Sequence, residues 1–250
     1  MELHTLGVQG GYTQNDVKEL ARILTGWTVS ARSDTGFQFV MRLHESGHKT
    51  LMGQSIPESA QFIGEKEGEH AIRFLANHPS TAKRISRRLA EYFVADVPPQ
   101  TLIDEMSSTF MATGGDIYQV MKVMLKHSAF WDPANKLYRT PYDFACASLR
   151  VLNVGQDRTK WLQAFGYAAV AGNGIQNWQT PDGYAFNANT WFTPEALTRR
   201  IDFALNIARN TSERNDLYAY LGDKTQKAVM QQPSAQRMGF VLGSSELVFK

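Results

Sequence analysis

The chain of 250 residues has a single cysteine, Cys146. A lone cysteine excludes an internal disulfide and also a zinc site built from several thiolates. Cys146 lies within the apolar segment DFACASLRVL, so we expect a buried and unreactive thiol.

Long hydrophobic runs and an excess of charge are also missing. No apolar stretch approaches the ~20 residues that a membrane-spanning helix needs, so we expect no membrane span. The 26 Lys and Arg residues nearly balance the 24 Asp and Glu residues, for a net charge of +2. This balance gives no indication of a nucleic-acid partner. The first residues, MELHTLGVQGG, lack the basic start and apolar centre of a signal peptide.

Signals for the starts of helices recur along the chain. The clearest is Thr13, which has Asp16 three residues later as the partner of a capping box. Further starts are expected at Thr101 (with Asp104 as its partner), Asp116, Thr140 and Thr193, and proline follows the last two. The sequence therefore predicts a mainly α protein, a multi-helix orthogonal bundle forming a single helical domain over residues 1–250.

Two stretches do not have a helical pattern. In residues 37–43 apolar and polar side chains alternate, which indicates a strand, and residues 49–53 are expected to return as its partner. We therefore expect one small β-hairpin near residues 37–53. Residues 172–191 form a long segment rich in Gly, Asn and Pro with aromatic residues among them. Loops of this length without regular structure are usually functional or mobile.

The segment HESGH, residues 44–48, matches the H-E-x-x-H pattern of zinc peptidases. In those enzymes both histidines reach the zinc from one face of a helix. Here the preceding residues alternate as a strand and Gly47 favours a turn, so a hairpin tip is the favoured interpretation. A weaker metal hypothesis keeps His44 and His48 as ligands of a divalent ion, joined by Glu45 or a distant histidine. Solvated or hydrogen-bonded histidines are the commoner outcome.

Several motifs together resemble a bacterial family known as domain of unknown function 1800. They are ELHTLGVQGGYTQNDVKELARILTGW, F-x-F with HESGHKTLMG, LANHPSTAKRISRRLAEYFVADVPP, the K-x-x-R-T-P-x-D-F segment over residues 136–144, and PDGY followed by Trp191. The motifs occur in the family's order over nearly all of the chain. The resemblance implies a mainly helical, exported protein, periplasmic or secreted, with no established activity or cofactor.

The resemblance also implies that family members are usually longer on the N-terminal side. The chain would then be the C-terminal part of a longer family domain. Members are often encoded beside a sulfatase-like exported protein, which makes that protein a candidate partner. Because no signal peptide is evident in this chain, a cytoplasmic location stays open.

The family pattern also changes the interpretation of residues 44–49. The pattern resembles His-Asp, then Gly, then Lys-Thr, so Glu45 replaces the aspartate and His48 falls on a varied position. The match to zinc peptidases then looks accidental. His44, Glu45 and Lys49 become candidate catalytic residues of an acid/base site. They are equally compatible with a structural cluster of ion pairs and hydrogen bonds, which we favour.

The aromatic loop supplies a second candidate site. Trp178, Tyr184 and Trp191 offer flat apolar faces, and Asp182 lies among them. Such a combination suits stacking on a carbohydrate and recognition of its hydroxyl groups, or an amphipathic ligand pocket. The alternative is a loop held on the core by its aromatic side chains.

Two functional hypotheses follow. The first is an exported binding or assembly module that acts with a partner protein or an envelope glycan through the aromatic loop. The second is a hydrolase-type enzyme, with or without a metal, centred on residues 44–49. The structural observation that would favour the enzyme is a concave pocket shared by the two segments.

Overall fold

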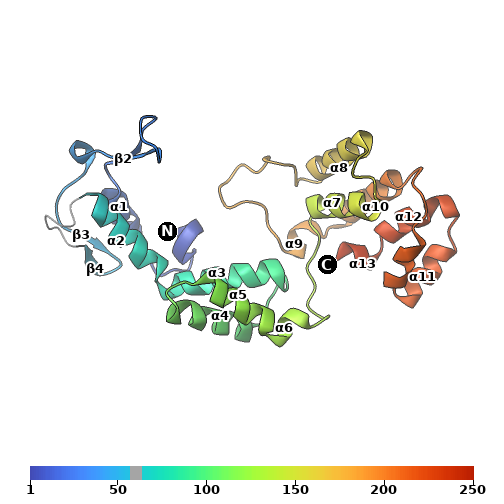
Figure 1. The fold of residues 1–250 in the computed structure, drawn as a ribbon, viewed down its shortest axis with the longest axis horizontal. Helices are drawn as coiled ribbons and strands as arrows, with labels where there is room; N and C mark the ends of the chain where they lie inside the picture. Colours follow the sequence, from blue (N-terminus) through green and yellow to red (C-terminus); the bar gives the residue numbers. More distant parts are fainter. Residues whose placement is uncertain (57–63) are drawn as a thin grey trace. The chain divides into compact units, whose positions relative to one another are not determined.

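The computed structural model describes residues 1–56 and 64–250 (Figure 1). Its elements are mostly α-helices, with two small two-stranded sheets among the described residues. The prediction of a mainly α protein is therefore confirmed. No helix in the described ranges is long and apolar enough to cross a membrane.

The chain groups into two compact units. Unit 1 contains residues 1–89 and 99–127, and unit 2 contains residues 90–98 and 128–250. The chain passes between the units at three places, and the first lies inside helix α3 (Pro79–Phe93), between Leu89 and Ala90. The single helical domain over residues 1–250 therefore remains a prediction.

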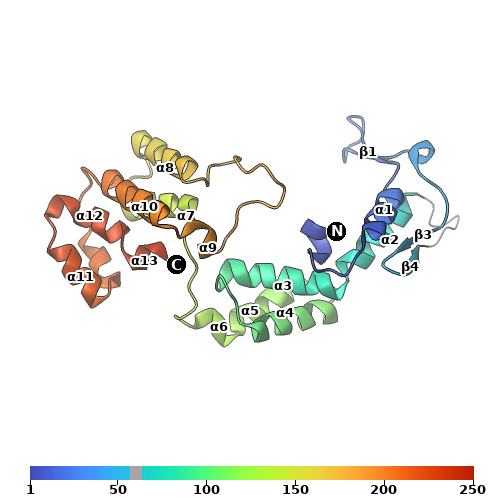
Figure 2. The same cartoon turned by 180° about the vertical axis from the view of Figure 1, so that it is seen from behind.

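Unit 1 combines helices with both sheets. Its elements are a short π-helix η1 (Glu2–Leu6), α1 (Gln14–Ile23), β1 (Trp27–Val29), β2 (Phe37–Phe39), the 3₁₀ turn η2 (Met41–Leu43), β3 (Lys49–Leu51), β4 (Gln54–Ile56), α2 (Glu65–Ala76), most of α3, α4 (Gln100–Ala112) and α5 (Ile117–Lys126). One core cluster joins η1, α1, β3, β4 and α2 through buried side chains such as Ile23, Leu51 and Leu75. α4 and α5 pack side by side in both views (Figures 1 and 2).

Both stretches predicted as strands are strands only in part, because residues 41–43 form the 3₁₀ turn η2 and β3 ends at Leu51, and each strand pairs with a different partner from the one we expected. Phe37–Phe39 pairs antiparallel with Trp27–Val29, and Lys49–Leu51 pairs with Gln54–Ile56. The turn between β3 and β4 is Met52–Gly53, and both residues have positive φ. Alternation along the sequence identified the strands, but it carries no information about which segment pairs with which.

Unit 2 is helical. Its elements are the end of α3, α6 (Ser128–Trp131), α7 (Pro141–Val151), α8 (Arg158–Val170), α9 (Ala188–Trp191), α10 (Pro194–Ile207), the 3₁₀ helix η3 (Asn215–Tyr220), α11 (Asp223–Met230), α12 (Ser234–Leu242) and α13 (Ser245–Val248). α7, α8 and α10 pack against one another, and α12 packs on α10.

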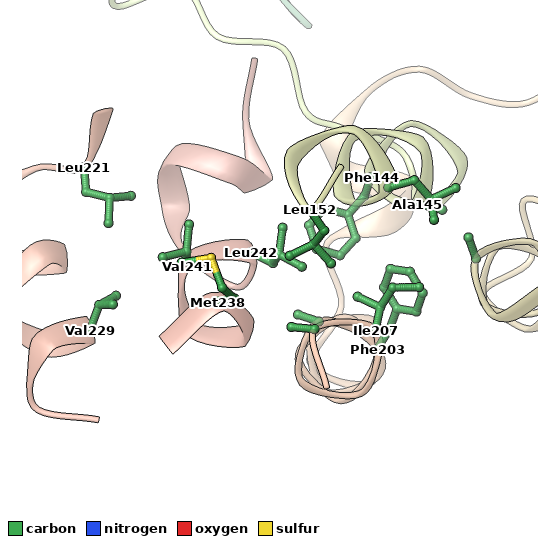
Figure 3. Packing of buried hydrophobic residues seen from close by; sticks show 14 of the residues in the cluster. Phe144, Ala145, Leu152, Phe203, Ile207, Leu221, Val229, Met238, Val241 and Leu242 are labelled. Atoms are coloured by element: carbon green, nitrogen blue, oxygen red, sulfur yellow. The ribbon is translucent and has the colours of Figure 1, made fainter. Parts of the chain in front are cut away.

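The core of unit 2 lies between α7, α10 and α12 (Figure 3). Phe144 of α7 faces Phe203 and Ile207 of α10, and Leu242 of α12 points into the same space. Phe144, Ile207 and Leu242 are fully buried, so each contributes about 1.5–3 kcal/mol relative to an exposed side chain. Cys146, also on α7, is half-buried rather than buried as we expected.

Most of the predicted helix starts are confirmed. Thr13 and Asp16 form a complete capping box, and the side chains of Asp116, Thr140 and Thr193 each accept a hydrogen bond from a backbone N–H of the first turn. The prediction at Thr101 is wrong, because α4 begins one residue earlier with Pro99 as its N-cap. Asp104 instead accepts a hydrogen bond from the Gln100 side chain.

Candidate functional site

A pocket of about 370 Å³ lies in unit 2. Four segments line it: the end of α3, the chain that leads into α7 with the first turn of that helix, the loop between α8 and α9, and the C-terminal residue Lys250. Aromatic side chains dominate the lining, with carboxylate, amide and amine groups among them. Its aromatic members are Tyr92, Tyr138, Tyr142, Tyr184 and Phe186, and its polar members include Glu91, Asp143, Asn173, Gln176 and Lys250.

Asn173 ties the loop to the start of α7. Its side chain is buried, and its Oδ1 accepts a hydrogen bond from the backbone N–H of Tyr142 at 2.9 Å. This N–H is one of the donors that a helix start leaves without an internal partner. Within the loop, the hydroxyl of Tyr184 donates to the carbonyl oxygen of Gly174 at 2.6 Å. These bonds fix the Tyr184 ring in the pocket wall.

Tyr138 forms the most buried part of the lining and is held from behind by Arg200. Nη2 of Arg200 donates to the Tyr138 hydroxyl at 2.7 Å and to the Arg139 carbonyl at 2.6 Å. The guanidinium also lies 4.7 Å from the centroid of the Tyr138 ring and 4.3 Å from that of Phe144. Burial raises the pKa of Tyr138, although the charge of Arg200 opposes the rise. Tyr138 is therefore a neutral, rigid part of the pocket.

The aromatic residues at the end of α3 and in the loop are more exposed. Tyr92 is 52% exposed and Phe186 is 40% exposed, and their rings meet edge to face with centroids 5.8 Å apart. Lys250 and Asp143 form an ion pair at 2.7 Å, with both side chains partly accessible. The pocket thus offers ring surface that a ligand can reach and charged groups that can accept or donate hydrogen bonds.

The structure separates the residues that we predicted to bind a ligand. Tyr184 lines the pocket. Trp191 is buried and its Nε1 donates to the Ala185 carbonyl at 2.8 Å, so it supports the loop from the core. Trp178 packs against Tyr184, and its Nε1 donates to Oδ1 of Asp182 at 2.9 Å. Trp178 and Asp182 are not among the residues that line the pocket. Hydrogen bonds from Thr180 and Trp178 lower the pKa of Asp182.

Sequence reasoning missed most of the other pocket residues. Tyr92 lies at the end of α3 and Tyr138 in the connection between α6 and α7, and neither was among the predicted site residues. Asp143 was identified as part of a helix start, and its place in the lining depends on how α7 meets the loop. One feature of the sequence could have drawn attention to Tyr138 and Asp143: the family motif over residues 136–144 coincides with a predicted helix start.

The predicted catalytic residues lie in unit 1. His44 and Lys49 come together, and their partner is Glu67 of α2. Nζ of Lys49 lies 2.8 Å from Oε2 of Glu67, and Nε2 of His44 lies 3.5 Å from the same oxygen. Glu45 is not part of this cluster, because its exposed side chain pairs with Arg22 at 2.7 Å.

The segment HESGH is not helical, so it lacks the geometry of a zinc-peptidase motif. The two histidines have different partners: Nδ1 of His44 lies 2.8 Å from the Thr25 carbonyl oxygen, and Nε2 of His48 lies 3.3 Å from the Thr50 hydroxyl. In the described part of the chain, no group of three or more His, Cys, Asp or Glu side chains is arranged to hold a metal ion. The divalent-metal hypothesis stays a prediction.

Comparison with known proteins completes the description of the site. Neither the curated proteins nor the solved structures include a match to this chain. The family model described as protein of unknown function (DUF1800) matches residues 1–246. The match covers the segment around His44 and every lining residue of the unit 2 pocket except Lys250, and the chain therefore belongs to the DUF1800 family.

Proposed function

We propose that the protein is a binding module that holds a carbohydrate in the pocket of unit 2. The observation that carries this proposal is the lining, where Tyr92, Tyr184 and Phe186 surround a concave space with polar side chains beside them. The volume of about 370 Å³ is within the range of small-molecule sites.

The chemistry of the lining favours a sugar over a purely apolar ligand. The C–H face of a pyranose ring packs on an aromatic face, and tyrosine keeps a polar hydroxyl at its edge. The side chains of Asp143, Gln176 and Lys250 supply acceptors and donors for sugar hydroxyl groups. A purely apolar ligand would displace water from these side chains without replacing its hydrogen bonds, which costs free energy even though Asp143 and Lys250 pair with each other.

The setting of this binding follows from the family resemblance. We propose that the protein acts outside the cytoplasm of a bacterium, on an envelope glycan. A sulfatase-like exported protein encoded nearby is the proposed partner. Fractionation of cells that express the full-length gene tests the location, and co-purification tests the partner.

The geometry does not favour the hydrolase alternative at residues 44–49. The side chains of His44, Lys49 and Glu67 are 1%, 1% and 3% exposed. A substrate in solution therefore cannot reach these three side chains. The pocket in unit 2 is lined by unit 2 residues, whereas residues 44–49 belong to unit 1.

A glycan array followed by calorimetric titration tests the proposal. We expect wild-type protein to bind a subset of saccharides, and Tyr184→Ala to weaken binding at least tenfold, or about 1.4 kcal/mol, because it removes a wall of the pocket. Tyr220→Ala is the matched control, since Tyr220 is 78% exposed in the same unit and is not among the lining residues. Equal binding by wild type and Tyr184→Ala, or binding to no saccharide, contradicts the proposal.

A further inference from the structure

The cluster of His44, Lys49 and Glu67 in unit 1 is independent of the carbohydrate pocket. Lys49 lies on β3 and Glu67 on α2, elements that are both visible in Figure 1. All three side chains are at least 97% buried. Chemistry at this cluster must therefore take place between its own members.

Hydrogen bonding fixes the orientation of the imidazole. The Thr25 carbonyl lies 2.8 Å from Nδ1 of His44, and a carbonyl oxygen only accepts, so Nδ1 carries the proton. In the neutral ring, Nε2 then has the free lone pair. That lone pair lies 3.4 Å from Nζ of Lys49 and 3.5 Å from Oε2 of Glu67. One atom is thus placed to exchange protons with both the amine and the carboxylate.

Apolar and aromatic groups enclose the cluster. The ring of Phe39 meets the His44 ring edge to face, with centroids 5.7 Å apart. Trp27 packs against Gly68, the residue next to Glu67, so closely that a Cβ there would meet the indole at 2.4 Å. In such surroundings a separated ammonium and carboxylate pay a large desolvation cost. A reaction that removes both charges is favoured in the same surroundings.

We propose that Lys49 and Glu67 condense to form an intramolecular amide, with His44 as the proton relay. The Lys49 ammonium passes one proton to Nε2 of His44, which delivers it to the Glu67 carboxylate, and the free amine then attacks the side-chain carbon of the neutral carboxyl group. The new C–N bond replaces one C–O bond. The departing hydroxyl group takes one proton from nitrogen and leaves as water. One amide N–H remains, and no oxidant or co-reactant is required.

The cross-link would join β3 directly to α2 and close the segment between residues 49 and 67. A covalent link of this kind restricts the unfolded chain, as a disulfide does. It would provide this constraint in a chain whose single cysteine cannot form an internal disulfide. This role differs from the hydrolase hypothesis, because the reaction is internal and takes place once per molecule.

Intact-mass spectrometry of the purified full chain is the test. The proposal predicts a mass lower than that of the sequence by one water molecule, and a proteolytic fragment in which Lys49 is joined to Glu67. The arginine in Lys49→Arg keeps the positive charge but is a poor nucleophile, so this variant should have the full mass expected from its own sequence. The exposed neighbour Lys66 is the matched control, and Lys66→Arg should still lose water.

The variants also separate the cross-link from a simple ion pair. His44→Gln leaves Lys49 and Glu67 in place and should form the amide more slowly, which a time course of intact mass measures. Folded wild-type protein that keeps the full mass after prolonged incubation overturns the proposal. Cross-linking of His44→Gln at the wild-type rate overturns the role of His44.

Discussion

At the scale of single residues, Arg200 shows how a buried charge can organise a site. Its side chain is among the largest fully buried in the described residues. It makes charge-assisted hydrogen bonds to the Tyr138 hydroxyl and the Arg139 carbonyl, and it stacks on Phe144. These contacts join α10 to the segment that lines the pocket. Arg200 is therefore a positioning residue for Tyr138.

Replacing Arg200 should destabilise unit 2. Arg200→Lys keeps the charge but loses the planar group that bonds and stacks at once, so we expect a loss of about 2–3 kcal/mol in the free energy of unfolding. Urea unfolding measures the loss. The adjacent Arg199 is the control, because it forms an exposed pair with Glu195 and Arg199→Lys should cost under about 0.5 kcal/mol. Equal losses would contradict the assigned role.

Glu246 predicts a pH dependence of stability. Burial would raise its pKa, but hydrogen bonds from the Gly222 and Glu246 N–H groups and from Ser245 outweigh burial and lower the pKa to about 2, against an ordinary 4.5. Because the folded pKa is depressed, the stabilisation is present above pH 4.5 and is lost as the pH falls towards 2.

Glu246→Gln should thus lower the free energy of unfolding at pH 7 by about 1–2 kcal/mol, after discounting for solvent screening. The difference between variant and wild type should shrink as the pH falls from 4.5 towards 2, because the unfolded wild-type chain gains a proton at Glu246 in this range before the folded protein does. Unfolding curves at pH 7 and at a pH near 3 measure it. A difference that does not change with pH would show that Glu246 does not titrate as described.

At the scale of elements, glycines set how closely the first hairpin packs on α2. A Cβ at Gly68 would meet Trp27 at 2.4 Å, and one at Gly64 would meet Phe39 at 2.1 Å. The hairpin of β1 and β2 therefore rests its aromatic side chains on glycine backbone.

Gly68→Ala should break this contact. Alanine favours a helix by about 1 kcal/mol over glycine, but the overlap with Trp27 costs more, so we expect a net loss of about 1–3 kcal/mol. Gly166→Ala in α8 is the matched control, because no atom lies within 4 Å of its added Cβ. It should stabilise the protein by about 0.5–1 kcal/mol. Thermal unfolding of both variants checks whether Gly68→Ala lowers the stability of the protein and Gly166→Ala raises it.

Sequence reasoning was most successful where the cause is local. The caps at Thr13, Asp116, Thr140 and Thr193 each depend on a residue three positions further on, and all are present. It was least successful where partners are distant. His44 and Lys49 were identified together, but their shared partner Glu67 lies 18 residues beyond Lys49 on another element. Among many glutamates, nothing local distinguishes the one that is buried.

At the scale of the whole molecule, the two candidate sites lie in different units. Unit 1 contains the buried cluster, and unit 2 contains the pocket. Of the four predicted ligand residues, Tyr184 alone lines that pocket, because Trp191 is buried in the core behind it and Trp178 pairs with Asp182. The sequence identified an aromatic loop, but the direction of each ring depends on tertiary packing.

Hydrogen-exchange mass spectrometry with a bound saccharide tests the central claim most directly. Wild-type protein is compared with and without the tightest ligand from the glycan array. A ligand in the pocket of unit 2 should slow exchange in peptides that cover residues 137–143 and 173–186, and leave residues 44–56 unchanged. Protection of residues 44–56 instead, or no protection in either pocket segment, would contradict carbohydrate binding at this pocket.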